Sequence, residues 1–121
     1  MKRSPRQRCG DWAEQRALRL LQQRGWRLLD RQWRCPWGEL DLVLAKGERL
    51  LLVEVKARRM PGRDGGGVAA LGLPKLQRLE RSWNCWLAAH PERERCTVEM
   101  VAALVPLPPT RLPVRWIRLG S

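Results

Sequence analysis

The sequence predicts a single α/β or α+β domain in which helices flank a central β-sheet. Two observations support this fold class. A chain of 121 residues is long enough for one domain and leaves no room for a second. Segments with helical or strand-like spacing of apolar residues follow one another in the order α, β, β, β, α, β, β.

The first predicted helix covers about residues 12–24 and stops at Gly25. Its apolar residues at helical spacing are Trp12, Ala13, Ala17, Leu20 and Leu21. Glu14 has two interpretations. With Asp11 it fits a capping box at the start of the helix. It also shares a face with apolar residues of the helix, so it points toward the sheet and can reach a site there.

The other predicted elements follow from spacing and from turn residues. A glycine-rich loop over residues 58–74 precedes a second amphipathic helix at about 75–89. Gly47 is placed to adopt the positive φ of a hairpin turn. Strands are predicted at residues 26–33, 39–45, 50–57, 96–105 and 114–119.

The charge of the chain predicts a polyanionic partner. Basic residues number 24 against 12 acidic ones, which gives a net charge of +12. A basic arm over residues 1–9 precedes the domain, which we place at 10–121. No exposed basic amphipathic helix, transmembrane segment or signal peptide is evident, so we expect a cytoplasmic protein that binds nucleic acid and not membranes.

Four cysteines are widely spaced, at positions 9, 35, 85 and 96. Without a CxxC pair, and with His90 as the one histidine, the spacing of a zinc site is missing. Two disulfides remain an alternative, but we expect reduced thiols packed as small apolar residues.

The hairpin turn predicts which residues of its two strands face each other. If the turn is centred between Gly47 and Glu48, Asp41 lies opposite Glu54 and Glu39 lies opposite Lys56. All four then share one face with Val43, Ala45, Leu50 and Leu52. The other face is apolar and belongs to the core, with Leu40, Leu42, Leu44, Leu51, Val53 and Val55.

Two opposed carboxylates destabilise a sheet unless they share a proton or a cation lies between them. Mg²⁺ is a suitable cation, because it binds one or two carboxylates together with water and substrate phosphate. Lys56, on the same face, is placed to donate to a scissile phosphate or to hold an attacking water. The alternatives are an ordinary ion pair between Glu39 and Lys56 and a solvated charged face. Only four of the 24 basic residues are lysine, which favours a specific need for a compact ammonium at position 56.

Four motifs carry a resemblance to a known family: GDWAEQRAL, GELDLVL, LLVEVKAR and KLQRL. Over roughly residues 8–118 the chain resembles the YraN-like family of predicted endonucleases, a branch of the restriction-endonuclease-like superfamily that includes archaeal Holliday junction resolvases. The resemblance implies an α/β fold with a mixed central sheet flanked by helices. It also implies a D…ExK signature that binds Mg²⁺ or Mn²⁺. The chain departs from the family at Val98 and Glu99, where relatives tend to carry an aromatic residue and Asp.

Site residues follow from the matched motifs. Asp41, Glu54 and Lys56 correspond to the catalytic signature, and Glu14, Asp41 and Glu54 to metal ligands. Glu39 belongs to the GE-x-D motif as a supporting residue, for which we expect Lys56 as partner. Contacts to nucleic acid are expected from Arg58, Lys75 and Arg78, although Lys75 and Arg78 also fit a solvated helix start.

The sequence therefore favours a metal-dependent endonuclease that hydrolyses phosphodiesters in DNA rather than RNA. No helix-turn-helix or zinc-finger pattern is present, so we expect selectivity for branched, flap or single-stranded structures. Resolvase-like relatives imply a homodimer, because two symmetric cuts need two sites. The main alternative is a non-catalytic nucleic-acid-binding protein that retains the nuclease fold. A membrane-surface or scaffold role is a weaker one.

Overall fold

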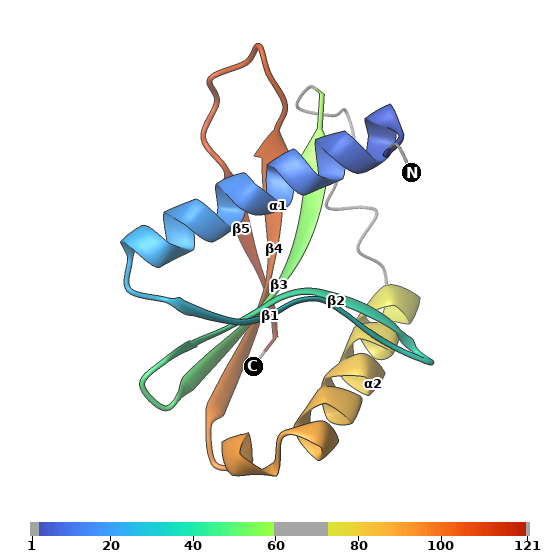
Figure 1. Cartoon of the computed structure of the whole chain (residues 1–121), viewed down its shortest axis with the longest axis vertical. Coiled ribbons are helices and arrows are strands. Elements are labelled where there is room, and N and C mark those ends of the chain that lie inside the picture. The colour runs from blue at the N-terminus through green and yellow to red at the C-terminus, as the bar shows by residue number, and fades with distance from the viewer. Residues whose placement is uncertain (1–2, 60–72, 121) are drawn as a thin grey trace.

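A five-stranded mixed sheet with one helix on each face forms the fold, as the computed structural model of residues 3–59 and 73–120 shows (Figure 1). The predicted order of helices and strands is confirmed, with one added 3-10 turn. In chain order the elements are α1 (Pro5–Gln23), β1 (Arg27–Cys35), β2 (Gly38–Lys46), β3 (Arg49–Arg58), α2 (Leu73–Ala89), η2 (Pro91–Arg93), β4 (Thr97–Pro106) and β5 (Arg115–Gly120). Most of the predicted loop at 58–74 lies outside the described residues.

The strands lie side by side in the order in which they occur in the sequence, β1 to β5. Neighbours are antiparallel except for β3 and β4, which are parallel and are connected through α2. This mixed sheet with flanking helices confirms the predicted fold class and is consistent with a restriction-endonuclease-like fold.

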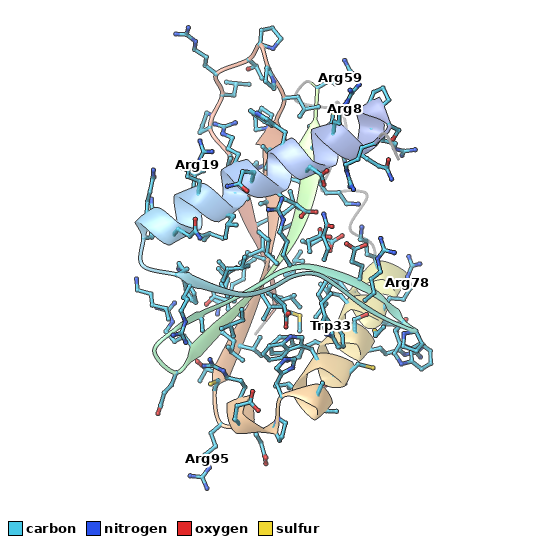
Figure 2. The ribbon with its side chains drawn as sticks, in the orientation of Figure 1. Arg8, Arg19, Trp33, Arg59, Arg78 and Arg95 are labelled. Atoms are coloured by element: carbon cyan, nitrogen blue, oxygen red, sulfur yellow. The ribbon has the colours of Figure 1, made fainter. Side chains whose placement is uncertain are left out.

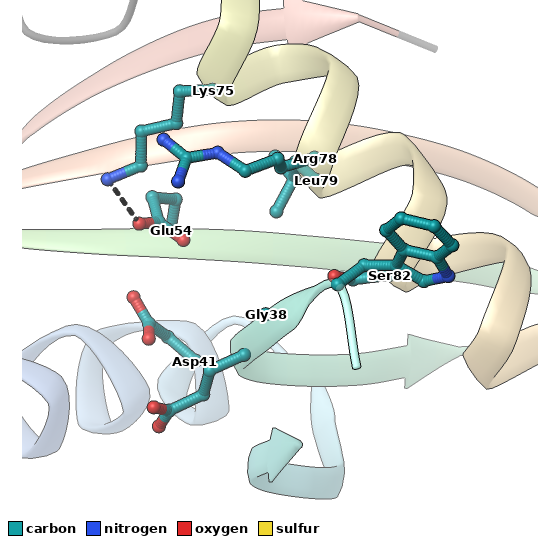
Figure 3. A pocket seen from close by; sticks show the side chains of 9 residues that line it. Gly38, Asp41, Glu54, Lys75, Arg78, Leu79 and Ser82 are labelled. Carbon is teal, nitrogen blue, oxygen red and sulfur yellow. Dashed lines mark ion pairs between the residues drawn. The ribbon is translucent and has the colours of Figure 1, made fainter. Parts of the chain in front are cut away.

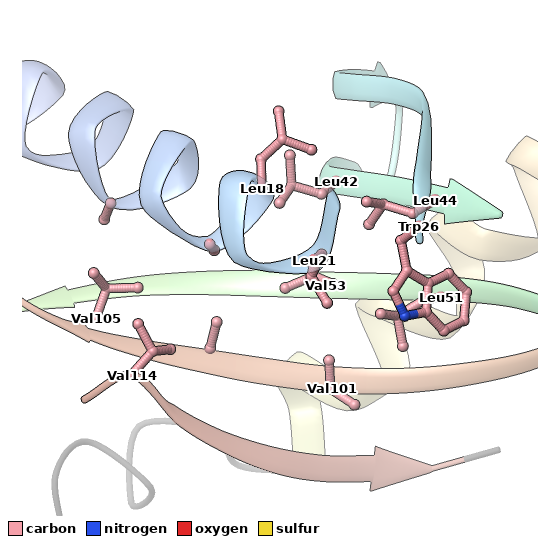
Figure 4. Packing of buried hydrophobic residues seen from close by; sticks show 13 residues of the cluster. Leu18, Leu21, Trp26, Leu42, Leu44, Leu51, Val53, Val101, Val105 and Val114 are labelled. Atoms are coloured by element: carbon pink, nitrogen blue, oxygen red, sulfur yellow. The ribbon is translucent and has the colours of Figure 1, made fainter. Parts of the chain in front are cut away.

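Both faces of the sheet are buried, each under its own helix. The cluster beneath α1 includes Leu42, Leu44, Leu51 and Val53, the core face predicted from alternation (Figure 4). Beneath α2, Leu79, Trp83 and Trp86 pack on the opposite face. There they cover Val43, Ala45, Leu50 and Leu52, the apolar part of the face predicted to carry the charges. The central strands are therefore apolar on both sides along this half of their length.

Leu40 does not lie on the face that the alternation predicted for it. It packs in the α2 cluster with Val43 and not with Leu42 and Leu44. Strict alternation along β2 therefore fails between Leu40 and Leu42. This break comes at the point where β2 approaches the charged residues.

Helix α1 begins earlier than predicted, at Pro5 and not near residue 12. Ser4 is its N-cap, because the Ser4 side chain accepts a hydrogen bond from the Gln7 amide and Gln7 bonds back to the Ser4 backbone. Proline at the first helical position favours this start. The capping box predicted for Asp11 and Glu14 is wrong, and the second half of the basic arm is helical. The helix end is as predicted, with Gly25 at φ 93°.

Basic side chains are distributed over much of the surface. The labelled arginines of Figure 2 project from α1, from the end of β3, from α2 and from the segment after η2. Among the residues that the structure describes, no helix is both long enough and apolar enough to span a bilayer.

Candidate active site

Asp41 lies where β2 and β3 stop pairing. The predicted register is confirmed from Lys46–Arg49 to Leu42–Val53, one step short of the expected pair of Asp41 and Glu54. Beyond this point the Asp41 side chain, and not the β2 backbone, bonds to β3: its Oδ2 accepts a hydrogen bond of 2.8 Å from the Val55 amide. The carboxylate thus satisfies a backbone donor that the ladder leaves free, which fixes its position.

Asp41 and Glu54 nevertheless line the same cavity, which has a volume of about 280 Å³. Glu54 is 8% exposed, and its Oε1 lies 2.9 Å from Nζ of Lys75. Figure 3 shows Lys75 and Arg78 reaching from α2 on one side of Glu54, with Asp41 of β2 on the other side. The structure therefore brings together two predicted acids and two of the predicted phosphate-binding residues.

The pKa of Asp41 in this cavity differs strongly from its ordinary value. Burial and the negative charge of Glu54 raise the pKa of Asp41 to about 8, against the opposing hydrogen bond from the Val55 amide. The smaller repulsion from Glu14 and Glu39 acts in the same direction. Asp41 is therefore largely protonated at neutral pH.

The pKa values of two neighbouring lysines, Lys56 and Lys75, are shifted in opposite directions. Burial, together with the hydrogen bond and charge of Lys75, lowers the pKa of Lys56. Burial also acts to lower the pKa of Lys75. The hydrogen bonds to Lys56 and Glu54 and the charges of Glu54 and Asp41 outweigh this effect and raise that pKa. Lys75 is thus the more firmly charged of the pair, and Lys56 more readily becomes a neutral amine.

Glu14 is buried at 8% exposure and points toward the sheet, as one of the two interpretations predicts. Its Oε1 accepts hydrogen bonds of 3.2 Å from Nε of Arg31 and 3.1 Å from Nε2 of Gln32. Burial raises the pKa of Glu14 although both hydrogen bonds oppose that effect. Within residues 3–59 and 73–120, no group of three or more His, Cys, Asp or Glu side chains is placed to hold a metal ion. Asp41 and Glu54 are thus the nearest to a ligand pair, and Glu14 as a ligand stays a prediction.

Glu39 has a different partner from the one predicted. Its carboxylate lies 3.8 Å from Nε of Arg34, the residue paired with it on β1. The expected pair with Lys56 is wrong, because the ladder between β2 and β3 ends before it reaches Glu39. Glu39 still lines the cavity of Asp41 and Glu54.

A second cavity, of about 660 Å³, lies at the C-terminal end of β3. Lys56, Arg58 and Arg59 from the end of β3 line it together with Arg6 from α1. Nε of Arg58 is buried, and it has no hydrogen-bond partner within the described part of the chain. The predicted nucleic-acid contacts are therefore divided between two cavities, with Arg58 in this one and Lys75 and Arg78 in the first.

Four residues of the first cavity were not predicted as site residues: Trp37, Gly38, Leu79 and Ser82. Trp37 is 48% exposed, and the guanidinium of Arg81 lies 5.0 Å from its ring centroid. An exposed tryptophan in a Pro-Trp-Gly turn was the available signal. Ser82 carried no signal, since a serine on an amphipathic helix is unremarkable until the helix is docked.

Comparison with known proteins identifies the family. Residues 13–103 match the model of the uncharacterised protein family UPF0102. A UPF0102 protein of Prochlorococcus marinus strain MIT 9303 is 52% identical over 114 residues, covering 94% of this chain and 90% of that protein. Another, from Synechococcus sp. strain CC9902, is 49% identical over 110 residues and covers 91% of each chain. A UPF0102 protein of Streptomyces griseus is 39% identical over 99 residues, with 80% and 82% coverage. The chain belongs to the UPF0102 family.

Proposed function

We propose that this protein is a divalent-metal-dependent endonuclease that acts on DNA, with Asp41 and Glu54 as metal ligands. The observation that carries the proposal is the presence of both acids in one cavity, close enough that Glu54 helps to raise the pKa of Asp41. The resemblance of GELDLVL and LLVEVKAR to the D…ExK signature of restriction-endonuclease-like enzymes supports the same conclusion.

The donor set suits Mg²⁺ or Mn²⁺. Carboxylate oxygens are the ligands that these hard cations prefer, and one or two of them suffice when water and a substrate phosphate complete the shell. A proton on Asp41 and the ammonium of Lys75 beside Glu54 supply the positive charge that a metal ion would replace. When bound, such an ion polarises a phosphodiester and lowers the pKa of a coordinated water.

The basic residues of the chain have separate tasks in this proposal. Lys56, which lines the second cavity and hydrogen-bonds Lys75, would hold an attacking water or stabilise the charge that develops on the phosphate. Lys75 and Arg78 face the same cavity from α2 and would bind phosphate oxygens. Arg58 would contact the strand from the second cavity, where its buried Nε lacks a partner among the described residues.

The net charge of +12 supports a phosphate-rich substrate, bound largely through its backbone. Such contacts carry little sequence information, so we propose selectivity for DNA structure: branches, flaps or single strands. Two symmetric cuts in a branched substrate need two sites, for which a homodimer would serve. An enzyme of this kind would act in the cytoplasm.

Cleavage of labelled single-stranded, duplex, flap and four-way-junction DNA, with Mg²⁺, Mn²⁺ or EDTA, tests the proposal. Asp41→Asn and Lys56→Met should lose cleavage by at least about a hundredfold while they remain folded. Lys46→Met is the matched control, because Nζ of Lys46 bonds the Arg24 carbonyl at 2.7 Å on the far side of the hairpin. Undiminished cleavage by Lys56→Met, or cleavage in EDTA, would refute the assignment.

The second candidate is a nucleic-acid-binding protein without catalysis. One observation favours it: Lys75 lies 2.9 Å from Glu54, so the charge of Glu54 is balanced without a metal ion. This candidate predicts DNA affinity that falls steeply with salt and yields no product with any metal. In that case Asp41→Asn would bind DNA as well as the wild type does.

A further inference from the structure

Two thiols that the proposed function does not use meet beside the first cavity. Cys35 ends β1 and Cys85 lies on α2, yet their side chains are within hydrogen-bonding distance of each other. The turn between β1 and β2 rests on α2 at this point. A Cβ added at Gly38 would lie 3.5 Å from Oγ of Ser82, and Arg81 lies over the ring of Trp37. The contact between the thiols is therefore part of a wider docking of the turn onto the helix.

The two sulfurs have unequal surroundings. Burial acts to raise the pKa of Cys35, but hydrogen bonds from the Ser82 side chain and the backbone amides of Trp37 and Gly38 outweigh it and lower that pKa. Burial and the neighbouring Cys35 raise the pKa of Cys85. Both side chains are partly exposed, so a small oxidant can reach them. Cys35 is thus the better nucleophile and Cys85 is placed to react with it.

We propose that Cys35 and Cys85 form a redox-active pair that hydrogen peroxide converts into an intramolecular disulfide. The Cys35 thiolate attacks the peroxide, so an S–O bond forms, the O–O bond breaks and water leaves after protonation. The Cys85 sulfur then attacks the sulfenic acid, which forms the S–S bond and releases a second water. In total, two thiols and one hydrogen peroxide give one disulfide and two waters. A dithiol reductant reverses the step by exchange.

The link would act on the wall of the candidate active site. Trp37, Gly38 and Ser82 line the same cavity as Asp41 and Glu54. A disulfide between Cys35 and Cys85 would join the end of β1, which leads directly into Trp37 and Gly38, to the helix α2 that carries Ser82. Oxidation would therefore hold the turn against α2 and fix the width of the cavity at this side.

Peptide mapping of the full chain tests the pair. The protein is treated with hydrogen peroxide, its remaining thiols are alkylated, and it is digested with trypsin without reduction. We expect peptides 35–46 and 82–93 to be joined, with the loss of two hydrogen masses, and to separate on addition of dithiothreitol. The Cys9→Ser/Cys96→Ser double variant is the matched control and should form the link fully. An absent link in that variant, or links that mainly involve Cys9 or Cys96, would overturn the proposal.

A second measurement needs no substitution. Site-resolved alkylation of the reduced wild-type chain at neutral pH should modify Cys35 at least several-fold faster than Cys9, Cys85 or Cys96. Equal rates at the four sites would count against Cys35 as the attacking thiol. Both readouts are masses, so they hold whether or not the protein cleaves DNA, and failure of the nuclease proposal leaves them unaffected.

Discussion

Replacing Asp41 with asparagine should stabilise the protein, and the gain should grow with pH. The pKa of this carboxyl is about 8 in the folded state because burial and Glu54 disfavour its charge, whereas its ordinary value is 3.8. Below the ordinary value the group is protonated in both states, so the substitution changes little. As the pH rises, the unfolded chain releases the proton first, and the folded wild type loses stability until about pH 8. Asparagine avoids that cost and still accepts the hydrogen bond from Val55.

The size of the effect follows from the same two values. A rise from 3.8 to about 8 corresponds to about 6 kcal/mol of unfolding free energy once the pH exceeds both. Between about pH 5 and pH 9, the difference in unfolding free energy between Asp41→Asn and wild type should increase by at most about 4 kcal/mol. Local rearrangement and water entry reduce such costs, so we expect a measured change of about 2 kcal/mol.

Urea unfolding of wild type and Asp41→Asn at several pH values between 5 and 9 measures this change. Glu80→Gln is the control, since Glu80 lies exposed on α2. Added Mg²⁺ should stabilise the wild type and not Asp41→Asn, because a ligand stabilises only the state that binds it. Parallel stability profiles for wild type and Asp41→Asn across this range would refute the assigned repulsion between Asp41 and Glu54.

Three further substitutions test other parts of the structure by the same unfolding assay. Lys75→Met removes the cation 2.9 Å from Glu54 and should cost about 1–3 kcal/mol, part of which Mg²⁺ should restore; the same loss from Lys46→Met would contradict this. Trp86→Phe removes the 2.7 Å hydrogen bond to Asp30 inside the α2 cluster and should cost about 1–3 kcal/mol, whereas no loss would show that solvent replaces the indole. Gly47→Ala should cost about 1 kcal/mol, because φ is 62° there, whereas Gly10→Ala in α1 should stabilise by about 0.5–1 kcal/mol; equal effects would contradict the backbone argument.

The hairpin was predictable because its signals are local. Gly47 sets the turn, the turn sets the register, and alternation then assigns Leu42, Leu44, Leu51 and Val53 to one face. The limit of the prediction is equally local. A register counted from the turn assumes that pairing continues, whereas β2 leaves β3 after Leu42 and the Asp41 side chain takes over the next backbone donor. Nothing in the alternation marks that break, so the partner of Glu39 was wrong.

The contribution of α2 to the site could be predicted only in part. The KLQRL motif indicated Lys75 and Arg78 as phosphate contacts, and both do line the first cavity. The sequence did not indicate that Lys75 would neutralise Glu54 or lower the pKa of Lys56. Those interactions depend on how a helix docks on a sheet across a long connection, and no short-range pattern specifies that geometry.

The charged cavity is a better indicator of function than any single motif, because it works against the stability of the fold. The neighbouring positions of β2 and β3 bury apolar side chains on both faces, so apolar residues at 41 and 54 would suit the same sheet. Instead the chain places two acids there and supplies Lys75 to offset one of them. Such local conflicts with the rules of packing are concentrated at functional sites. If Asp41→Asn proves more stable than wild type at neutral pH, the cost of the carboxylate is real, and binding a cation is the most direct reason to bear it.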